Sequence, residues 1–296
     1  MTATPSGMSG LHRGFRRGPG WCSRILHESL GKRLAYNEKL REMVKEEPSH
    51  AFLSNPASQN TYLYQVEFVQ AFSEEYFRKS LSDLAILDWG CGKGHVSFLL
   101  RERGACVVSC DHCEDGEDSD SAFGQKTPII ELAGIGVDQL SDPVKLPYAD
   151  SRFDVALSFG VLEHVREDLE SLKELRRVLR PGGLLFCFNL PYRFSWTQKV
   201  TRWRGISYHD RLYSKAQTAA LLHGAGYVLF DLWHRQLFPK NNVRYPFYRA
   251  FECLDQALVR FTPMRFLATN IEFVAAAEGT QGAYPPLAAG RPEDAA

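Results

Sequence analysis

ILDWGCGKGHVSFLL, residues 86–100, is the stretch that decides the fold of this chain. An apolar run ends at an acid and a tryptophan, glycines follow at positions 90, 92 and 94, and a second apolar run begins after His95. Glycine adopts positive φ readily and lets another group approach the backbone closely. The stretch therefore predicts a strand, a tight turn that lies against something, and a helix.

The same alternation continues toward the C-terminus. Further apolar runs predict strands at 105–111, 153–159, 184–191, 228–234 and 271–277. Helical patterns fall between them at 95–104, 163–180 and 215–227. Strands that alternate with helices form a mostly parallel sheet covered on both faces. The predicted fold class is α/β, a doubly wound and mostly parallel sheet with an N-terminal helical cap and an insertion near the C-terminal part.

This core domain is expected over residues 81–277. It is flanked by a disordered basic leader at 1–35, a helical cap at 36–80, and a disordered tail rich in Ala, Gly and Pro at 278–296. Within the domain, 191–213 and 236–266 interrupt the alternation. We expect these two segments to cover the substrate.

Composition excludes several classes of protein. The 35 basic residues cancel the 35 acidic ones, so nucleic acid is not an expected partner. Seven cysteines without a secretory-type start indicate a reducing compartment, and no apolar run reaches the ~20 residues that cross a bilayer. We expect a cytoplasmic protein. The arginine-containing first 27 residues leave import into an organelle as the alternative.

The spacing of the glycines distinguishes between the candidate ligands of the turn. A dinucleotide fingerprint, G-x-G-x-x-G, would need glycine where His95 stands. Asp88, just before the loop, would repel a pyrophosphate but not a cationic ligand. NAD and FAD are therefore disfavoured, and a cationic nucleotide-like ligand is favoured. The alternative is a turn that closes a strand-helix joint without any ligand.

Several motifs together resemble the class I S-adenosylmethionine-dependent methyltransferases that carry a type 11 methyltransferase domain. DWGCGKG resembles the first motif of that family, and Asp111, closing ACVVSCD, lies where the family has the acid that holds both ribose hydroxyls. LPYADSRFDVALSFGVLEHV and LKELRRVLRPGGLLFCFN resemble its fourth-strand and fifth-strand regions. The resemblance covers about 84–191, with a looser similarity to 277. It implies a Rossmann-like fold and S-adenosyl-L-methionine as the methyl donor.

The resemblance also implies a cofactor-binding set on the loop and the strand ends: Asp88, Gly90, Gly92, Gly94, Asp111, Asp142 and Phe159. In this set Asp88 would anchor the loop or the ammonium group of the ligand. Asp142 would meet the adenine amine, with Asp138 as a competitor. Phe159 and Gly160 would border the sulfonium.

Two other patterns indicate metal chemistry at first sight. Cys106, Cys110 and Cys113 have the C-x3-C-x2-C spacing of iron-sulfur radical enzymes, and His112 could complete a zinc site. Cys106 and Cys110 lie on a predicted strand, where packing is their favoured role. Glu163-His164 resembles the end of an acid-x-x-acid-His metal motif of some quinone O-methyltransferases, but Gly160 replaces the first acid. No metal is expected.

Two aromatic and basic segments are candidate substrate elements. Residues 191–211 interleave aromatic and cationic side chains, which suits an anionic or polyhydroxyl substrate; a solvated loop anchored by its aromatics is the alternative. In 247–261, Phe and Leu recur at helical spacing. Such a stripe is expected to pack on its own domain, with dimerisation or peripheral membrane contact as alternatives.

The predicted function is methyl transfer to a small-molecule acceptor, at oxygen, including glycan- or lipid-linked intermediates. An oxygen nucleophile needs a base, and His209 and His164 are the candidates. Carbon methylation of a quinone-type ring is the nearest alternative. From other classes, an iron-sulfur radical enzyme and a non-catalytic S-adenosylmethionine-binding partner protein stay open. The sequence leaves the oligomeric state undetermined.

Overall fold

Two α-helices precede the sheet in the part of the chain that the structure describes. The computed structural model describes residues 30–45, 53–112, 128–205, 211–240 and 243–279. Helix α2 (Leu30–Met43) includes residues 30–35, which the sequence had assigned to the leader. Helix α3 (Pro56–Phe77) begins where Asn55 Oδ1 accepts from the Ala57 amide at 3.1 Å and Pro56 pre-sets the first turn.

Seven strands form one sheet in the order β3-β2-β1-β4-β5-β7-β6. They are β1 (Ala85–Trp89), β2 (Cys106–His112), β3 (Val137–Leu140), β4 (Phe153–Phe159), β5 (Leu179–Pro191), β6 (Tyr227–Arg235) and β7 (Asn270–Ala277). Strand β7 runs antiparallel to both of its neighbours, and the pairs formed by β1 to β5 are parallel. The predicted doubly wound, mostly parallel sheet is confirmed.

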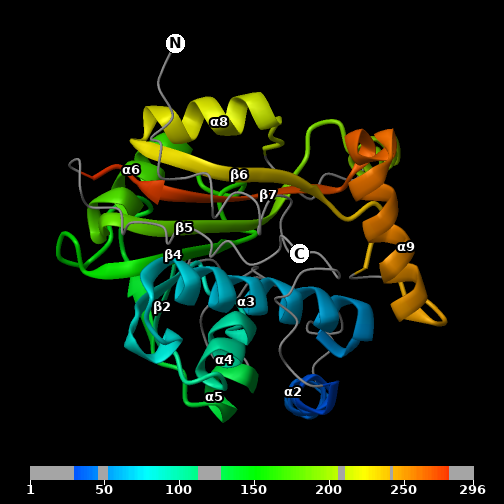
Figure 1. Cartoon of the computed structure of the whole chain (residues 1–296), viewed down its shortest axis with the longest axis horizontal. Coiled ribbons are helices and arrows are strands. Elements are labelled where there is room, and N and C mark those ends of the chain that lie inside the picture. The colour runs from blue at the N-terminus through cyan, green and yellow to red at the C-terminus, as the bar shows by residue number, and fades with distance from the viewer. Residues whose placement is uncertain (1–29, 46–52, 113–127, 206–210, 241–242, 280–296) are drawn as a thin grey trace, which may run out of the picture.

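Helices cover both faces of the sheet (Figure 1). On one face lie α3, α4 (His95–Arg101) and α5 (Pro128–Leu132); on the other lie α6 (Asp168–Val178) and α8 (Lys215–Gly224). Two buried apolar clusters follow from this arrangement. Successive strand residues point to opposite faces, so Leu157 of β4 belongs to the α3 side and Ala156 to the α6 side.

Several boundaries differ from the prediction. Helix α6 begins at Asp168 and not at Glu163, which lies in a turn after β4. Strand β5 begins at Leu179, before Pro181-Gly182-Gly183, where a helix stop was expected. The sequence also missed β3, α5 and the short helix α7 (Trp196–Trp203), because none of them has a long periodic pattern.

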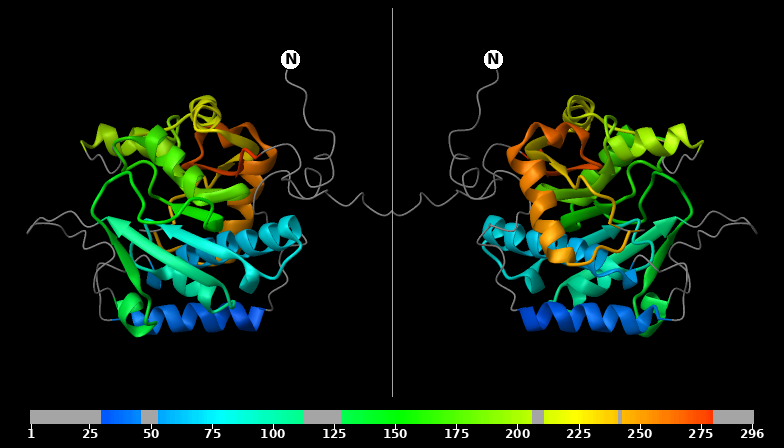
Figure 2. Two further views of the ribbon diagram at one scale, coloured as in Figure 1. Left: turned by 90° about the vertical axis from the view of Figure 1, so that its left-hand side faces the viewer. Right: turned by 90° about the vertical axis from the view of Figure 1, so that its right-hand side faces the viewer.

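Helix α9 (Tyr248–Phe261) and the 3-10 turn η3 (Pro263–Leu267) stand beside the sheet at one end of the molecule (Figures 1 and 2). The apolar stripe of α9 was expected to pack on its own domain, and this was wrong. Phe247, Phe251, Leu254 and Phe261 are between 37% and 86% exposed, and only Leu258 of the stripe is half-buried. None of the helices in the described ranges is long and apolar enough to cross a membrane.

Candidate active site

Strand order places the glycine turn at the centre of one sheet edge. The order reverses between β1 and β4, whose carboxyl ends lie side by side in register. Ligands of open α/β sheets bind in the crevice at such a reversal. The turn from Gly90 to Gly94 connects the end of β1 with the start of α4, so it borders this crevice.

All three glycines of the turn have positive φ: 68° at Gly90, 51° at Gly92 and 77° at Gly94. A Cβ on Gly90 would come within 2.5 Å of Val161, and one on Gly94 within 2.6 Å of Ile130. Close packing therefore accounts for Gly90 and Gly94. Of the three, Gly92 is the one whose backbone amide is aimed at a candidate ligand-binding acid.

That acid is Asp111 at the end of β2. Its Oδ2 accepts a hydrogen bond of 2.6 Å from the Gly92 amide, and its Oδ1 accepts one of 2.8 Å from the His112 amide. The side chain is 8% exposed. Burial raises the pKa of Asp111, and the two backbone amides oppose that shift. The carboxylate is thus held at the crevice with lone pairs to spare.

Asp88, on β1, lies beneath the turn and is 1% exposed. Ser97 Oγ of α4 donates to Asp88 Oδ2 at 2.6 Å, and the same hydroxyl lies 2.7 Å from Ser109 Oγ of β2. Burial raises the pKa of Asp88 to about 6. These contacts connect β1, α4 and β2, so they favour the loop-anchoring role of Asp88 over contact with a ligand ammonium.

The end of β4 provides the other wall of the crevice. Phe159 is half-buried, with its ring centroid 4.7 Å from that of Phe188. Gly160 follows with φ 70° and donates its amide to the Phe188 carbonyl at 3.0 Å. In the next turn Glu163 is buried and His164 exposed, and a Cβ on Gly160 would lie 3.6 Å from Glu163 Oε1.

Glu163 is an acid for which the sequence predicted no role beyond an incomplete metal motif. Burial raises its pKa to about 8. A carboxyl group with such a pKa can hold or accept a proton near neutral pH. The signal available in the sequence was its position four residues after the predicted strand at 153–159.

The remaining predicted residues are placed less centrally. Asp142 is exposed and accepts from the Val144 and Lys145 amides, each at 2.8 Å, which lower its pKa. Its competitor Asp138 accepts from the Tyr148 hydroxyl at 2.8 Å. His209 lies outside the described residues.

The positions of the cysteines do not fit the ligands of an iron-sulfur cluster. Cys106 and Cys110 both belong to β2, so four residues of extended chain separate their Cα atoms by roughly 13 Å. Cys110 is buried, which raises the pKa of its thiol, and Cys113 lies outside the described ranges. Across the part of the chain that the structure describes, no group of three or more His, Cys, Asp or Glu side chains is arranged to hold a metal.

Comparison with known proteins agrees with this geometry. Residues 87–187 match the family model described as "Methyltransferase domain". The ubiquinone biosynthesis O-methyltransferase of Parvibaculum lavamentivorans is 36% identical over 115 residues, which cover 38% of this chain and 42% of that protein. The enzyme of the same name from Cereibacter sphaeroides is 32% identical over 139 residues, covering 43% and 52%. The chain thus spans about half the length of these curated relatives.

A solved structure from Galdieria sulphuraria, assigned as a sarcosine dimethylglycine methyltransferase, superposes with a TM-score of 0.50. It is 14% identical and covers 82% of this chain and 98% of its own, so it speaks for the fold alone. The fold and the glycine turn together define a Rossmann-like domain whose crevice suits a nucleotide-like ligand. Residues 87–187, which match the methyltransferase family model, lie at the centre of this domain, and the strand order is that of the class I S-adenosylmethionine-dependent methyltransferase fold.

The crevice fits S-adenosylmethionine, which supplies an electrophilic methyl group when bound. Asp111 is a fixed acceptor suited to a ribose diol, and Gly92 has no side chain that would occupy the space above the turn. The residues at the end of β4 would border the reacting group. Phe159 would exclude water there, because its ring packs on Phe188 and does not hydrogen-bond.

Proposed function

We propose that the protein transfers a methyl group from S-adenosylmethionine to a hydroxyl of a small-molecule acceptor. The observation that carries the proposal is the Gly92-Asp111 pair at the sheet reversal, inside a matched methyltransferase domain. The names of the curated relatives, which are O-methyltransferases, favour oxygen over carbon as the nucleophile. Carbon methylation of a quinone-type ring is the second candidate within this class.

The chemistry asks little of the protein besides alignment, water exclusion and removal of one proton. His164 and His209 stay our candidates for the base. Glu163 joins them because its carboxyl group lies in the turn after β4 and its pKa is raised to about 8. His164 follows Glu163 directly, but its side chain is exposed whereas that of Glu163 is buried, so the position of the acceptor at the end of β4 decides which of the two takes the proton.

An acceptor screen tests the proposal. The purified chain is incubated with donor labelled on the methyl group and with panels of phenols, catechols, hydroxyquinones and saccharides, and the products are identified by mass spectrometry. Label on oxygen supports the proposal, and label on ring carbon selects the second candidate. Tight binding of S-adenosylhomocysteine with no transfer to any acceptor would indicate a non-catalytic binding protein.

We also propose that the protein works at an anionic membrane surface, through α9 and η3. The acids of α9 face inward: Glu252 and Asp255 are 4% and 2% exposed. Lys240 Nζ lies 3.5 Å from Glu252 Oε1 and 3.3 Å from Asp255 Oδ2. Asp255 Oδ1 also accepts from the Leu237 and Phe238 amides at 2.7 and 3.0 Å.

The outward side of the same segment is apolar and cationic. Exposed Phe251, Leu254 and Phe261 continue into exposed Met264, Phe266 and Leu267 of η3. Arg244, before α9, and Arg265, within η3, are exposed, and Glu252 and Asp255 are the sole acids in the sequence from 243 to 267. An apolar face with cationic neighbours and its acids turned away complements a bilayer of anionic lipid. We expect this to be the cytoplasmic side of a membrane, because the cysteines favour a reducing compartment.

Vesicle sedimentation tests this surface. Leu254→Ser should reduce binding to vesicles of phosphatidylcholine and phosphatidylglycerol at least several-fold. Leu132→Ser on α5, which is 68% exposed and far from α9 in Figure 1, should not. Equal loss in both variants, or binding that ignores the anionic lipid, would contradict the proposal. A lipid-free dimer that Leu254→Ser dissociates would assign the face to a second copy of the chain.

A further inference from the structure

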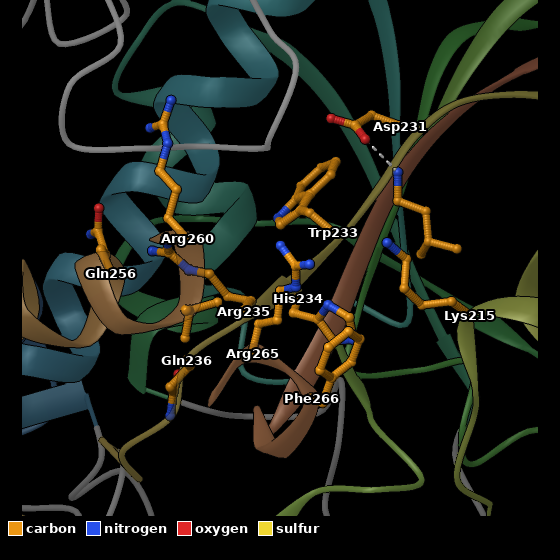
Figure 3. Close-up of a pocket in the computed structure, with 12 residues that line it drawn as sticks. Lys215, Asp231, Trp233, His234, Arg235, Gln236, Gln256, Arg260, Arg265 and Phe266 are labelled. Atoms are coloured by element: carbon orange, nitrogen blue, oxygen red, sulfur yellow. Dashed lines mark hydrogen bonds between the residues drawn. The ribbon is translucent and has the colours of Figure 1, made fainter. Parts of the chain in front are cut away.

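A pocket of about 370 Å³ opens at the carboxyl end of β6, away from the glycine turn. Its walls come from β6, the start of α8, the last turns of α9, and η3 (Figure 3). Its titratable lining side chains are Lys215, Asp231, His234, Arg235, Arg260 and Arg265. In Figure 3, Lys215 and Asp231 lie to one side of His234 and the arginines to the other.

The charges of this lining do not balance. Asp231 interacts with Lys215, and Glu272 behind the pocket interacts with Arg235. Arg260 and Arg265 therefore leave an excess of two positive charges. Burial, together with Lys215 and Arg265, lowers the pKa of His234 to about 4, so its ring is neutral at physiological pH.

Two of the lining residues also carry buried polar atoms without partners. His234 Nε2 and Arg260 Nε are buried, and neither has a hydrogen-bond partner among the residues that the structure describes. Leaving a buried arginine N–H without an acceptor costs free energy. Lys215 is the first residue of α8, so the positive end of the helix dipole adds to the charge of this lysine and does not offset it. An anion in the pocket would offset the positive potential of this helix end and of the two arginines.

We propose that this pocket binds a phosphate group, carried by the methyl acceptor. This assignment rests on the proposed function. A phosphate monoester carries about two negative charges at pH 7 and accepts several hydrogen bonds, which matches the excess charge and the arginine donors. The pocket volume lies within the usual range for whole small ligands, about 300 to 1,000 Å³, so it has room for a group attached to the phosphate.

The sheet register relates the pocket to the methyl-transfer site. Arg235 of β6 pairs with Asn270 of β7, and Asn270 pairs with Pro191 of β5. Strand β5 in turn pairs Phe188 with Phe159 of β4. Three strand spacings of about 4.8 Å separate β6 from β4, or roughly 15 Å. Both sites lie at the same end of the sheet, so an acceptor that reaches both must be extended.

Titration calorimetry with inorganic phosphate and with pyrophosphate tests the pocket. The wild type should bind, and Arg265→Gln and Lys215→Met should each weaken binding at least tenfold. Lys173→Gln removes an exposed cation of α6 that pairs with Glu170, and it should change nothing. If the wild type binds neither anion, or if all four proteins bind with equal affinity, the proposal is wrong. If one variant fails to fold, the other carries the comparison.

Further arms identify the source of the phosphate. A phosphorylated acceptor predicts that methyl transfer to a sugar phosphate or phosphorylated phenol exceeds transfer to its dephosphorylated form, and that Arg265→Gln removes this preference. If the phosphate belongs to a lipid headgroup, Lys215→Met should lower vesicle binding. If the pocket binds free phosphate alone, neither the preference for a phosphorylated acceptor nor the loss of vesicle binding should appear. Either result would contradict the assignment of the phosphate to the acceptor. S-adenosylhomocysteine affinity should stay unchanged in all variants. If the wild type does not bind S-adenosylhomocysteine, that result would count against the proposed function and not against the pocket.

Discussion

The Gly92 amide donates a 2.6 Å hydrogen bond to Asp111 Oδ2, joining the turn after β1 to the end of β2. Because the His112 amide holds Oδ1 at 2.8 Å, the orientation of the carboxylate is set before any ligand arrives. Preorganised acceptors bind a ligand without a further ordering cost. The first two predictions follow from this pair.

Asp111→Ala should weaken S-adenosylhomocysteine binding by about 1.5 to 3 kcal/mol, because charge-assisted hydrogen bonds to the ribose are lost. Calorimetry measures the change. Asp111→Asn, which keeps the shape and one acceptor, should fall between the wild type and the alanine variant. An unchanged affinity in a folded Asp111→Ala protein would remove Asp111 from the site.

Gly92→Val should abolish S-adenosylhomocysteine binding while circular dichroism shows the helix content nearly intact, because the new side chain would occupy space above the turn. Gly104→Val is the matched control. Gly104 also has positive φ, 84°, a Cβ added to it would meet nothing within 4 Å, and it lies at the far end of α4. Retained binding in Gly92→Val would mean that the glycine serves the turn alone.

Replacing the candidate bases should lower turnover without changing donor affinity. We expect His209→Ala or His164→Ala to reduce kcat by ~10²- to 10⁴-fold, since a general base contributes about that much. S-adenosylhomocysteine affinity serves as the control. If both variants keep wild-type kcat and the acidic limb of the pH profile, the histidines have no part in catalysis and Glu163 becomes the candidate.

Glu163 should make stability depend on pH. Its pKa is about 8 in the folded chain and near 4.5 when unfolded, so the folded state binds more protons between these values. The free energy of unfolding should therefore fall as pH rises from about 4.5 to 8, by a few kcal/mol at most. Glu163→Gln should flatten this fall in urea titrations. An identical slope in both proteins would show that Glu163 is not buried as described.

Methyl transfer should survive treatment with EDTA. Gly160 stands where an acid would be needed to complete a ligand set with Glu163 and His164. Carboxylate and imidazole sites of this type need at least three protein ligands. Activity that disappears with chelator and returns with Mg²⁺ or Zn²⁺ would show that the ligands come from elsewhere in the chain.

Much of the fold was predictable because its signals are local. Each of β1, β2 and β4 is a short apolar run ending at a polar residue or a glycine, and such runs predict strands whatever the rest of the chain does. The positions of Gly92, in the turn after β1, and Asp111, near the end of β2, were predictable for the same reason, while their roles in binding stay predictions that rest on the family resemblance. Glu163 was not identified as a titrating group, because its raised pKa comes from burial, which depends on the packing around it.

Helix α9 shows what could not be determined from the sequence. Periodicity alone determines that residues 247–261 form a helix with one apolar and one polar face. It does not determine which face turns inward. Lys240 precedes the helix and is buried against Glu252 and Asp255, while Asn60 of α3 donates to Glu252. Paired and hydrogen-bonded charges can be buried, so these long-range contacts hold the polar face inside and leave the phenylalanines and leucines at the surface.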